Sequence, residues 1–196
     1  TGWGWDSVNR RPSGVSDRVG TCAQADEAQL ERAVESAGNA QALGARTGLE
    51  QRYNVLMAIG QELMARADEL GHLLSREEGK PLAEGRGEVY RSGQFFTYYA
   101  AETLRQMGET ADSVRDGIEI DIRREPVGVV AVISPWNFPM ATAAWKIAPA
   151  LAFGNAVIWK PANLVPASAV ALTEIIARQN LPKGLFSLVM GSGGAI

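Results

Sequence analysis

The chain has 196 residues, of which 46% are hydrophobic and 21% are charged, and its formal net charge is −3 at pH 7. This balance without any Lys/Arg block argues against nucleic-acid binding, and no apolar run reaches the eighteen or so residues of a membrane span. No secretory signal is visible at the N-terminus. The single Cys22 cannot form an internal disulfide and is expected to be a small buried filler, which favours a cytoplasmic protein.

The first half of the chain predicts helices. The first twenty-odd residues are rich in turn-forming Pro and Gly. After them, Asp26 is a good N-cap, and Leu30, Ala33, Val34 and Ala37 recur on one face of a helix. Further helices are predicted from about residue 50, from residue 68 to about 79, and from residue 82 to 105. Their apolar stripes, which include Gly60 and Gly93, are interpreted as helix core.

The hydrophobic period then changes from 3.6 to 2. In the segment GIEIDIRRE, Ile118, Ile120 and Ile122 alternate with charged residues, which predicts a half-buried strand. Residues 127–133, VGVVAVI, are apolar at every position, as is typical of a strand covered on both faces.

Residues 127–196 predict an α/β unit. Helices are expected over 141–152 and 166–179, and further strands over 156–160 and 185–190. Strand, helix, strand, helix, strand with short loops indicates a parallel, doubly wound, Rossmann-like sheet. Ligands of such sheets bind beyond the carboxyl ends of the strands. The candidate site residues are those that follow the three strands: Ser134, Pro135, Trp136 and Asn137; Lys160, Pro161, Ala162 and Asn163; and Gly191–Gly194.

The hexapeptide SPWNFP, residues 134–139, is an unusual exit from a buried strand. Pro135 and Pro139 fix the backbone on either side of Asn137, whose amide has two N–H donors and one acceptor. A donor held in this way can stabilise a carbonyl oxygen that becomes negative during a reaction. The alternative is an Asn that only closes a turn through its own backbone.

Two lysines are further candidates. Lys160 leaves a strand end beside a proline, where it either meets a ribose hydroxyl or phosphate or is simply solvated. Lys146 is the lone charge in an otherwise apolar helix, so it faces a cleft or extends to the surface.

Other chemical signals are weak. The glycines at 191–194 lack the full G-x-G-x-x-G spacing of a phosphate loop. His72 is the only histidine and has no visible Ser or carboxylate partner, which argues against a catalytic triad. No C-x-x-C or H-E-x-x-H spacing predicts a metal site.

The stretch from Glu125 to Ala169 closely resembles the aldehyde dehydrogenase superfamily. It carries the P-W-N-F-P turn, the W-K-x-x-P-A-L-A helix and the K-P-A strand end in the family's order and spacing. The preceding helical region is also similar to the family's N-terminal half, so the resemblance covers essentially the whole chain. Within the family, the chain looks most like bacterial semialdehyde dehydrogenases, particularly those for 2-oxoglutarate semialdehyde (2,5-dioxopentanoate).

The resemblance implies oxidation of an aldehyde to a carboxylic acid with NAD or NADP, through a thiohemiacetal on a catalytic Cys. It implies that Asn137 stabilises the oxyanion and that Lys146 lies near the active site. It further implies that Lys160 binds the adenosine ribose and its 2′-phosphate, with residues 134–136 and 161–163 lining the cofactor cleft. NAD-preferring relatives commonly carry a Glu where this chain has Asn163, so NADP is expected to be accepted at least as well as NAD.

The resemblance also implies a domain organisation. Residues 1–107 correspond to the N-terminal helical part of the cofactor-binding domain, 108–126 to a strand segment that pairs subunits in a homodimer or homotetramer, and 127–196 to the βαβαβ part. The F-T-G-S loop, the E-L-G-G-K glutamate and the catalytic Cys of the family have no counterpart here, and Cys22 cannot replace that Cys by position. We therefore expect the N-terminal portion of a longer enzyme, inactive by itself.

Two alternatives remain open from the sequence. One is a truncated, non-catalytic module that binds cofactor or pairs through its sheet edge. The other, an unrelated doubly wound nucleotide-binding domain, leaves the P-W-N-F-P turn unexplained.

Overall fold

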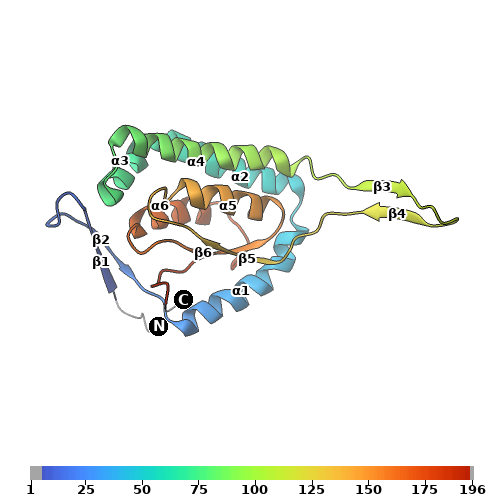
Figure 1. The fold of residues 1–196 in the computed structure, drawn as a ribbon, viewed down its shortest axis with the longest axis horizontal. Coiled ribbons are helices and arrows are strands. Elements are labelled where there is room, and N and C mark those ends of the chain that lie inside the picture. Colours follow the sequence, from blue (N-terminus) through green and yellow to red (C-terminus); the bar gives the residue numbers. More distant parts are fainter. Residues whose placement is uncertain (1–5, 195–196) are drawn as a thin grey trace.

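The computed structural model describes residues 6–194, so the ends of the first and last predicted segments, residues 1–5 and 195–196, lie outside it (Figure 1). The elements in chain order are β1 (Asp6–Arg10), β2 (Arg18–Ala23), α1 (Glu27–Arg46), α2 (Leu49–Ala65), α3 (Ala67–Glu78), α4 (Leu82–Thr103), β3 (Glu109–Asp112), β4 (Glu119–Ile122), β5 (Val129–Ile133), α5 (Ala141–Ala152), β6 (Ala156–Lys160), α6 (Pro166–Ala177) and β7 (Phe186–Leu188).

The centre of the molecule is a three-stranded parallel sheet in the order β5-β6-β7. In Figure 1 the sheet lies between α1 and a layer formed by α5 and α6, and α2, α3 and α4 cover the outer side of that layer. Helices on both faces of a parallel sheet make a doubly wound α/β unit, so the predicted fold class is confirmed. None of the helices within residues 6–194 is long and apolar enough to cross a membrane.

The four predicted N-terminal helices are present. Asp26 caps α1 as predicted: the main-chain N–H of Gln29 donates to Asp26 Oδ1 at 2.7 Å, and Gln29 Oε1 accepts from the Asp26 N–H at 2.9 Å. This reciprocal pair is a capping box. Ala37 is buried, but the prediction for Val34 was wrong, because Val34 is exposed on the outer side of the helix.

The N-terminal segment contains a hairpin that the sequence did not reveal. β1 and β2 pair antiparallel, with Ser7 opposite Cys22, at the end of the molecule farthest from β3 and β4 (Figure 1). Neither strand shows a clear alternation of apolar and polar residues, which explains why only turns were recognised there.

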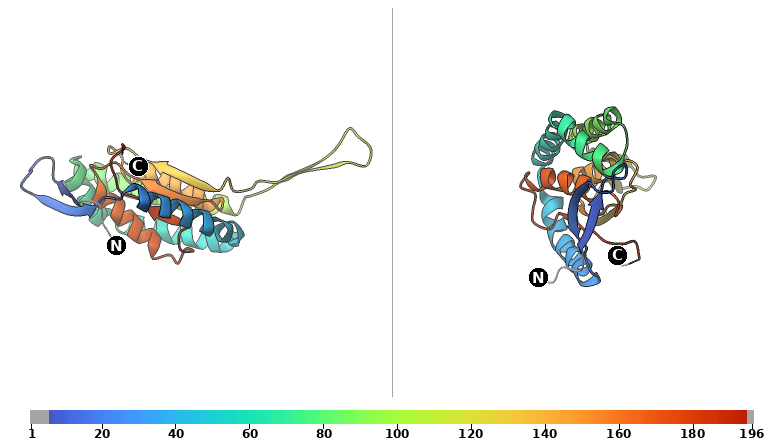
Figure 2. Two further views of the ribbon diagram at one scale, coloured as in Figure 1. Left: turned by 90° about the horizontal axis from the view of Figure 1, so that it is seen from below. Right: turned by 90° about the vertical axis from the view of Figure 1, so that its left-hand side faces the viewer.

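The predicted half-buried strand at GIEIDI is an exposed hairpin arm. β4 pairs with β3, which was not predicted, and the two strands extend away from the body of the protein (Figures 1 and 2). Ile118, Ile120 and Ile122 are between 43% and 50% exposed. The alternation is real, but the prediction of a half-buried strand was wrong, because no described element packs on the isoleucine face.

The prediction that residues 127–133 are covered on both faces was also wrong. Val127 and Ile133 are 86% and 67% exposed, and Val132 is the one fully buried residue of β5. The physical reason is that β5 is an edge strand of this sheet, pairing with β6 alone among the described strands. The central strand β6 is buried over Ala156–Trp159.

The contact between α2 and α4 depends on two glycines. A Cβ added to Gly93 would lie 2.6 Å from the carbonyl oxygen of Gly60, and one added to Gly60 would lie 2.7 Å from the carbonyl oxygen of Gly93. Backbone atoms cannot move aside as a flexible side chain can, so the two helices touch where neither has a side chain.

We predict that Gly93→Ala lowers the free energy of unfolding by about 1–3 kcal/mol, because overpacking forces the helices apart. The matched control is Gly87→Ala on the same helix, where an added Cβ has no atom within 4 Å. The control should leave stability unchanged or raise it by about 0.5–1 kcal/mol, since Ala favours helix over Gly. Urea denaturation followed by circular dichroism measures both, and equal stabilities for the two variants would contradict the close crossing.

Candidate active site

The parallel register brings the three predicted strand exits to one edge of the sheet. Ile133 at the end of β5 pairs with Lys160 at the end of β6. The Ser134 N–H donates to the Lys160 carbonyl at 3.3 Å, and the Val189 N–H donates to the Trp159 carbonyl at 2.9 Å. The segments 134–139, 160–163 and 191–194 therefore leave the sheet from its carboxyl edge, where α/β proteins bind ligands.

Ser134 anchors the hexapeptide to the central strand. It is only 4% exposed, and its Oγ accepts a hydrogen bond from the indole N–H of Trp159 at 2.9 Å. The hydroxyl is thus used inside the protein. This differs from the expected cleft-lining role, because Ser134 supports the loop from within and Pro135 and Trp136 form its exposed surface.

The side chain of Asn137 is uncommitted. Asn137 is exposed, and within residues 6–194 its amide makes no hydrogen bond. The alternative interpretation, an Asn that closes a turn through its own backbone, finds no support either, because the Asn137 main chain forms no hydrogen bond to another backbone group within the described residues. The backbone carbonyl of Asn137, in contrast, is fastened: it accepts a hydrogen bond from Lys80 Nζ at 2.8 Å.

Lys80 belongs to a buried ion pair that the sequence did not reveal. Its Nζ lies 2.7 Å from Glu88 Oε2 and 3.4 Å from Glu78 Oε2. The side chains of Lys80 and Glu88 are 7% and 1% exposed. On the other side, Glu88 Oε1 accepts hydrogen bonds from the main-chain N–H groups of Met140 and Ala141 at 2.9 and 3.1 Å. Glu88 therefore caps the N-terminus of α5, which has no capping side chain of its own.

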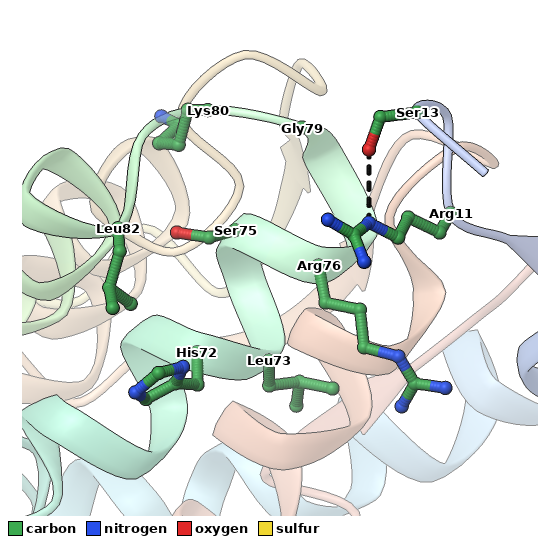
Figure 3. Close-up of a pocket in the computed structure, with 9 residues that line it drawn as sticks. All are labelled: Arg11, Ser13, His72, Leu73, Ser75, Arg76, Gly79, Lys80 and Leu82. Atoms are coloured by element: carbon green, nitrogen blue, oxygen red, sulfur yellow. Dashed lines mark hydrogen bonds between the residues drawn. The ribbon is translucent and has the colours of Figure 1, made fainter. Parts of the chain in front are cut away.

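The turn between α3 and α4 positions Lys80. Gly79 ends α3 in the left-handed conformation, with φ of 97°, which glycine adopts without strain. Beside this turn lies a cavity of about 590 Å³, between α3 and the turn of the β1–β2 hairpin (Figure 3). Arg11 and Arg76 line it, and Arg76 is engaged by the Asp17 carboxylate. None of the residues that line this cavity belongs to the segments 134–139, 160–163 or 191–194. Its link to the sheet edge is Lys80, which bonds to the Asn137 carbonyl.

Lys146 lies on α5, is exposed, and reaches the end of β5 with its ammonium group. Its Nζ donates a hydrogen bond to the Ile133 carbonyl at 2.8 Å. The sequence left open whether Lys146 faces a cleft or extends to the surface. In the structure the exposed side chain runs along the surface of α5 to the end of β5. It holds the residue immediately before the hexapeptide.

Lys160 lies half-buried at the end of β6. Its Nζ donates to the Pro161 carbonyl at 3.1 Å, and burial lowers the pKa of the Lys160 ammonium below its usual range. Because partial burial is unfavourable for an ammonium, an anion or a hydroxyl acceptor at this position would stabilise it. In the turn that follows Lys160, Pro161 is buried and Ala162 is half-buried. Asn163 is exposed and carries the polar side chain of this turn.

Asn163 does not cap the following helix. The first free N–H groups of α6 donate to Glu77 instead, Ala167 to Oε1 at 2.6 Å and Ser168 to Oε2 at 2.8 Å. Glu77 also accepts from Asn9 Nδ2 at 2.9 Å. Burial raises the pKa of Glu77, and these hydrogen bonds oppose the rise. The side-chain amide of Asn163 forms no hydrogen bond to any residue of the described chain.

Cys22 lies half-buried in β2, not fully buried as expected. Burial, reinforced by Glu77 and Asp6, raises the pKa of its thiol, which is opposite in direction to the lowered pKa of reactive cysteines. Within residues 6–194, no group of three or more His, Cys, Asp or Glu side chains is arranged to hold a metal ion.

Comparison with known proteins agrees with this geometry. The model of the aldehyde dehydrogenase family matches residues 7–196. The chain belongs to the aldehyde dehydrogenase family. Its fold matches an aldehyde dehydrogenase from Brucella melitensis biovar abortus with a TM-score of 0.95 and 33% identity, covering 98% of this chain and 40% of that one. Betaine aldehyde dehydrogenase from Staphylococcus aureus in complex with NAD⁺ gives a TM-score of 0.94 at 30% identity, over 97% and 38% of the two chains.

Curated relatives include several enzymes named for their aldehydes. The 3,6-anhydro-alpha-L-galactose dehydrogenase of Streptomyces coelicolor is 42% identical over 84% of this chain and 33% of its own length. The 2,5-dioxopentanoate dehydrogenase of Saccharolobus solfataricus is 38% identical over 77% and 32%. The predicted resemblance to semialdehyde dehydrogenases is therefore confirmed. This aldehyde dehydrogenase chain spans about a third of the length of these relatives.

The anchoring of Ser134 is testable. We predict that Ser134→Ala lowers the free energy of unfolding by about 1–3 kcal/mol, because the buried indole N–H of Trp159 loses its acceptor. Ser16→Ala, at an exposed turn, is the control and should change stability by less than about 0.5 kcal/mol. Urea denaturation followed by tryptophan fluorescence measures both, and a Ser134→Ala variant as stable as the control would contradict the anchoring.

Proposed function

We propose that this chain is the cofactor-binding, N-terminal part of an NAD(P)-dependent aldehyde dehydrogenase that oxidises an aldehyde to a carboxylic acid. The observation that carries the proposal is Asn137: an exposed side-chain amide without a partner in the described chain, on a loop held through the Ser134 side chain and through the main-chain carbonyl of Asn137. A donor fixed before the reaction begins has no reorganisation cost when charge develops on its ligand, and this is the requirement for oxyanion stabilisation.

In this proposal, a thiolate from outside residues 1–196 attacks the aldehyde to give a thiohemiacetal. The side-chain amide N–H of Asn137 donates a hydrogen bond to the aldehyde oxygen while that oxygen carries negative charge. Lys146 holds the end of β5 through the Ile133 carbonyl and so keeps the loop next to the reaction. Cys22 lies on β2, outside the segments 134–139, 160–163 and 191–194, and its half-buried thiol has a raised pKa, so it has no part in this proposal.

The residues at the edge of β6 fit a dinucleotide. When bound, NAD or NADP supplies the hydride acceptor for the oxidation. Lys160 is a partly desolvated ammonium that an anionic or hydroxyl ligand would stabilise, and Asn163 is an exposed, neutral amide three residues further on. We propose that these two bind the adenosine ribose and its 2′-phosphate, and that Pro135, Trp136, Pro161 and Ala162 line the cleft around the cofactor, with Ser134 supporting it from below.

The substrate class is an aldehyde of low molecular weight, and 2-oxoglutarate semialdehyde is the first compound to assay. Relatives from Haloferax volcanii and Bacillus subtilis are named for alpha-ketoglutarate semialdehyde, at 35% identity each. Because other relatives are named for glutarate semialdehyde and succinate semialdehyde, a panel of semialdehydes belongs in the same assay.

We further propose that the protein is a cytoplasmic homodimer or homotetramer. In this proposal residues 1–107 and 127–196 form the cofactor-binding part, and residues 108–126, which lie between them in the chain, pair one subunit with another. The half-exposed isoleucines of the β3–β4 arm support this, since an apolar row on a projecting edge is suited to pairing with another chain. The same arm supports a second candidate function, a non-catalytic pairing module. Aldehyde oxidation by the product of the complete reading frame distinguishes the two.

We expect Asn137→Ala, made in the product of the complete reading frame, to lower kcat roughly 10²–10³-fold, the usual effect of removing one oxyanion donor. Cofactor affinity should change by less than threefold, because the backbone that carries the loop is untouched. Asn54→Ala, at an exposed position of α2, is the control for the loss of an amide. Steady-state kinetics with the best aldehyde measures the effect, and a kcat within threefold of the parent would refute the assignment.

The cofactor prediction concerns Asn163. A carboxylate at this position would repel a 2′-phosphate by roughly 4 kcal/mol at about 4 Å and an effective dielectric of 20, whereas Asn163 does not. The parent should therefore use NADP⁺ at least as well as NAD⁺, and Asn163→Glu should shift the ratio of the two kcat/KM values at least tenfold toward NAD⁺. Asn54→Glu adds the same charge elsewhere and should leave the ratio unchanged. A parent that prefers NAD⁺ a hundredfold would show that Asn163 does not read the phosphate.

A further inference from the structure

The hexapeptide has little internal structure to hold it in place. Its first residue, Ser134, is bonded to β6, and the Phe138 carbonyl accepts from the Thr142 N–H at 3.1 Å. Between these two residues, the main chain is held by a hydrogen bond from another part of the protein, which Lys80 Nζ donates to the Asn137 carbonyl. The placement of Asn137 therefore depends on a residue 57 positions earlier in the chain.

The ion pair of Lys80 and Glu88 holds the segment at two places at once. The ammonium bonds to the carbonyl of residue 137, and the carboxylate bonds to the N–H groups of residues 140 and 141. The two charges are joined directly at 2.7 Å. A shift of the loop by one bond length would break the bond at the Asn137 carbonyl and the bonds at the N–H groups of residues 140 and 141. The ion pair therefore fixes where the backbone of the loop lies along α4.

The side chains of Lys80 and Glu88 are nearly inaccessible, so the bond between the two charges is stronger than it would be in water. The bond from Lys80 to the Asn137 carbonyl lies at the surface, and this ion pair holds its donor in place. The ammonium also lies 4.2 Å from the centre of the Phe138 ring, a cation–π distance that holds the side chain next to Asn137. Two carboxylates, Glu78 and Glu88, face one ammonium, and the positive N-terminus of α5 offsets part of the remaining negative charge.

From these contacts we propose that Lys80 and Glu88 are positioning residues that set the direction of the Asn137 amide during aldehyde oxidation. The proposal rests on the function proposed above for Asn137. Neither residue touches substrate: Lys80 acts through the Asn137 carbonyl, and Glu88 acts through the first turn of α5. Their loss should therefore lower kcat while leaving cofactor binding nearly unchanged.

The test is a double-mutant cycle in the product of the complete reading frame. Lys80→Met removes the ammonium and keeps an apolar stem of similar shape. We expect it to lower kcat at least 30-fold, with the Kd for NADP⁺ changed by less than threefold. In the Asn137→Ala background, the same substitution should lower kcat by less than threefold, because the group that it positions is gone. A merely structural role would give the same loss in both backgrounds.

Glu88→Gln is the second variant, and it keeps the shape and one acceptor oxygen. It should lower kcat by about three- to tenfold and show the same dependence on Asn137. The controls are Lys183→Met at an exposed lysine and Glu84→Gln on the exposed side of α4, and both should behave as the parent. Circular dichroism and unfolding midpoints identify any variant that is not folded, and in that case the milder Glu88→Gln decides the test.

Amide hydrogen exchange separates this proposal from the proposed function. Exchange at the main-chain N–H groups of residues 137–141, where Pro139 has none, should be at least tenfold faster in Lys80→Met than in the parent, and unchanged in Lys183→Met. If Asn137→Ala leaves kcat intact, the proposed function fails, and faster exchange still supports Lys80 as the residue that holds the loop. Additive losses of kcat in the cycle, or unchanged exchange at residues 137–141, would overturn the positioning role.

Discussion

Two buried glutamates connect the helical layer to the functional edge of the sheet. Glu77 on α3 caps α6, and Glu88 on α4 caps α5, each by accepting hydrogen bonds from two main-chain N–H groups in the first turn. Neither α5 nor α6 has a capping side chain of its own. A cap is worth about 1 kcal/mol, and a buried helix end without one would leave several polar groups unsatisfied. The two crossover helices therefore depend on α3 and α4 for their N-termini.

This arrangement explains why the candidate ligand-binding side chains are free. The loops that precede α5 and α6 carry Asn137 and Asn163, which are the residues that an isolated helix would recruit as caps or turn closers. Because glutamates from elsewhere satisfy the helix ends, both amides remain exposed and unbonded within the described chain. Fixing a loop through its backbone while leaving its side chain free is the usual requirement for a preorganised site.

The sequence predicted most of the elements and supplied the candidate site residues, but it did not reveal the residues that hold the loop with Asn137 in place. Periodicity located the helices and the parallel strands, and the two prolines around Asn137 marked the loop. Glu77, Lys80 and Glu88 were not identified from the sequence. A charged residue on an amphipathic helix gives the same pattern whether it is solvated or buried against a partner. The partners here are distant in the chain, 57 residues away for Lys80 and 90 for Glu77. The β1–β2 hairpin escaped because its strands lack alternation, and its buried residue Asn9 reads as a turn former.

The errors of burial have a common cause. An apolar pattern records which surfaces are covered in the working protein, not which are covered within one stretch of chain. Val127 before β5, Ile133 at its end and the isoleucines of the β4 segment are exposed here, yet their sequence pattern is that of covered strands. Since the chain spans about a third of the length of its curated relatives, we expect these surfaces to meet further structure. The edge of β5 would extend the sheet, and the face of β4 would meet a second subunit. The mismatch between pattern and exposure thus marks surfaces that no residue within 6–194 covers. The edge beyond β6, between Asn137 and Lys160, is in contrast the part of the proposed site whose supporting contacts all lie within these residues.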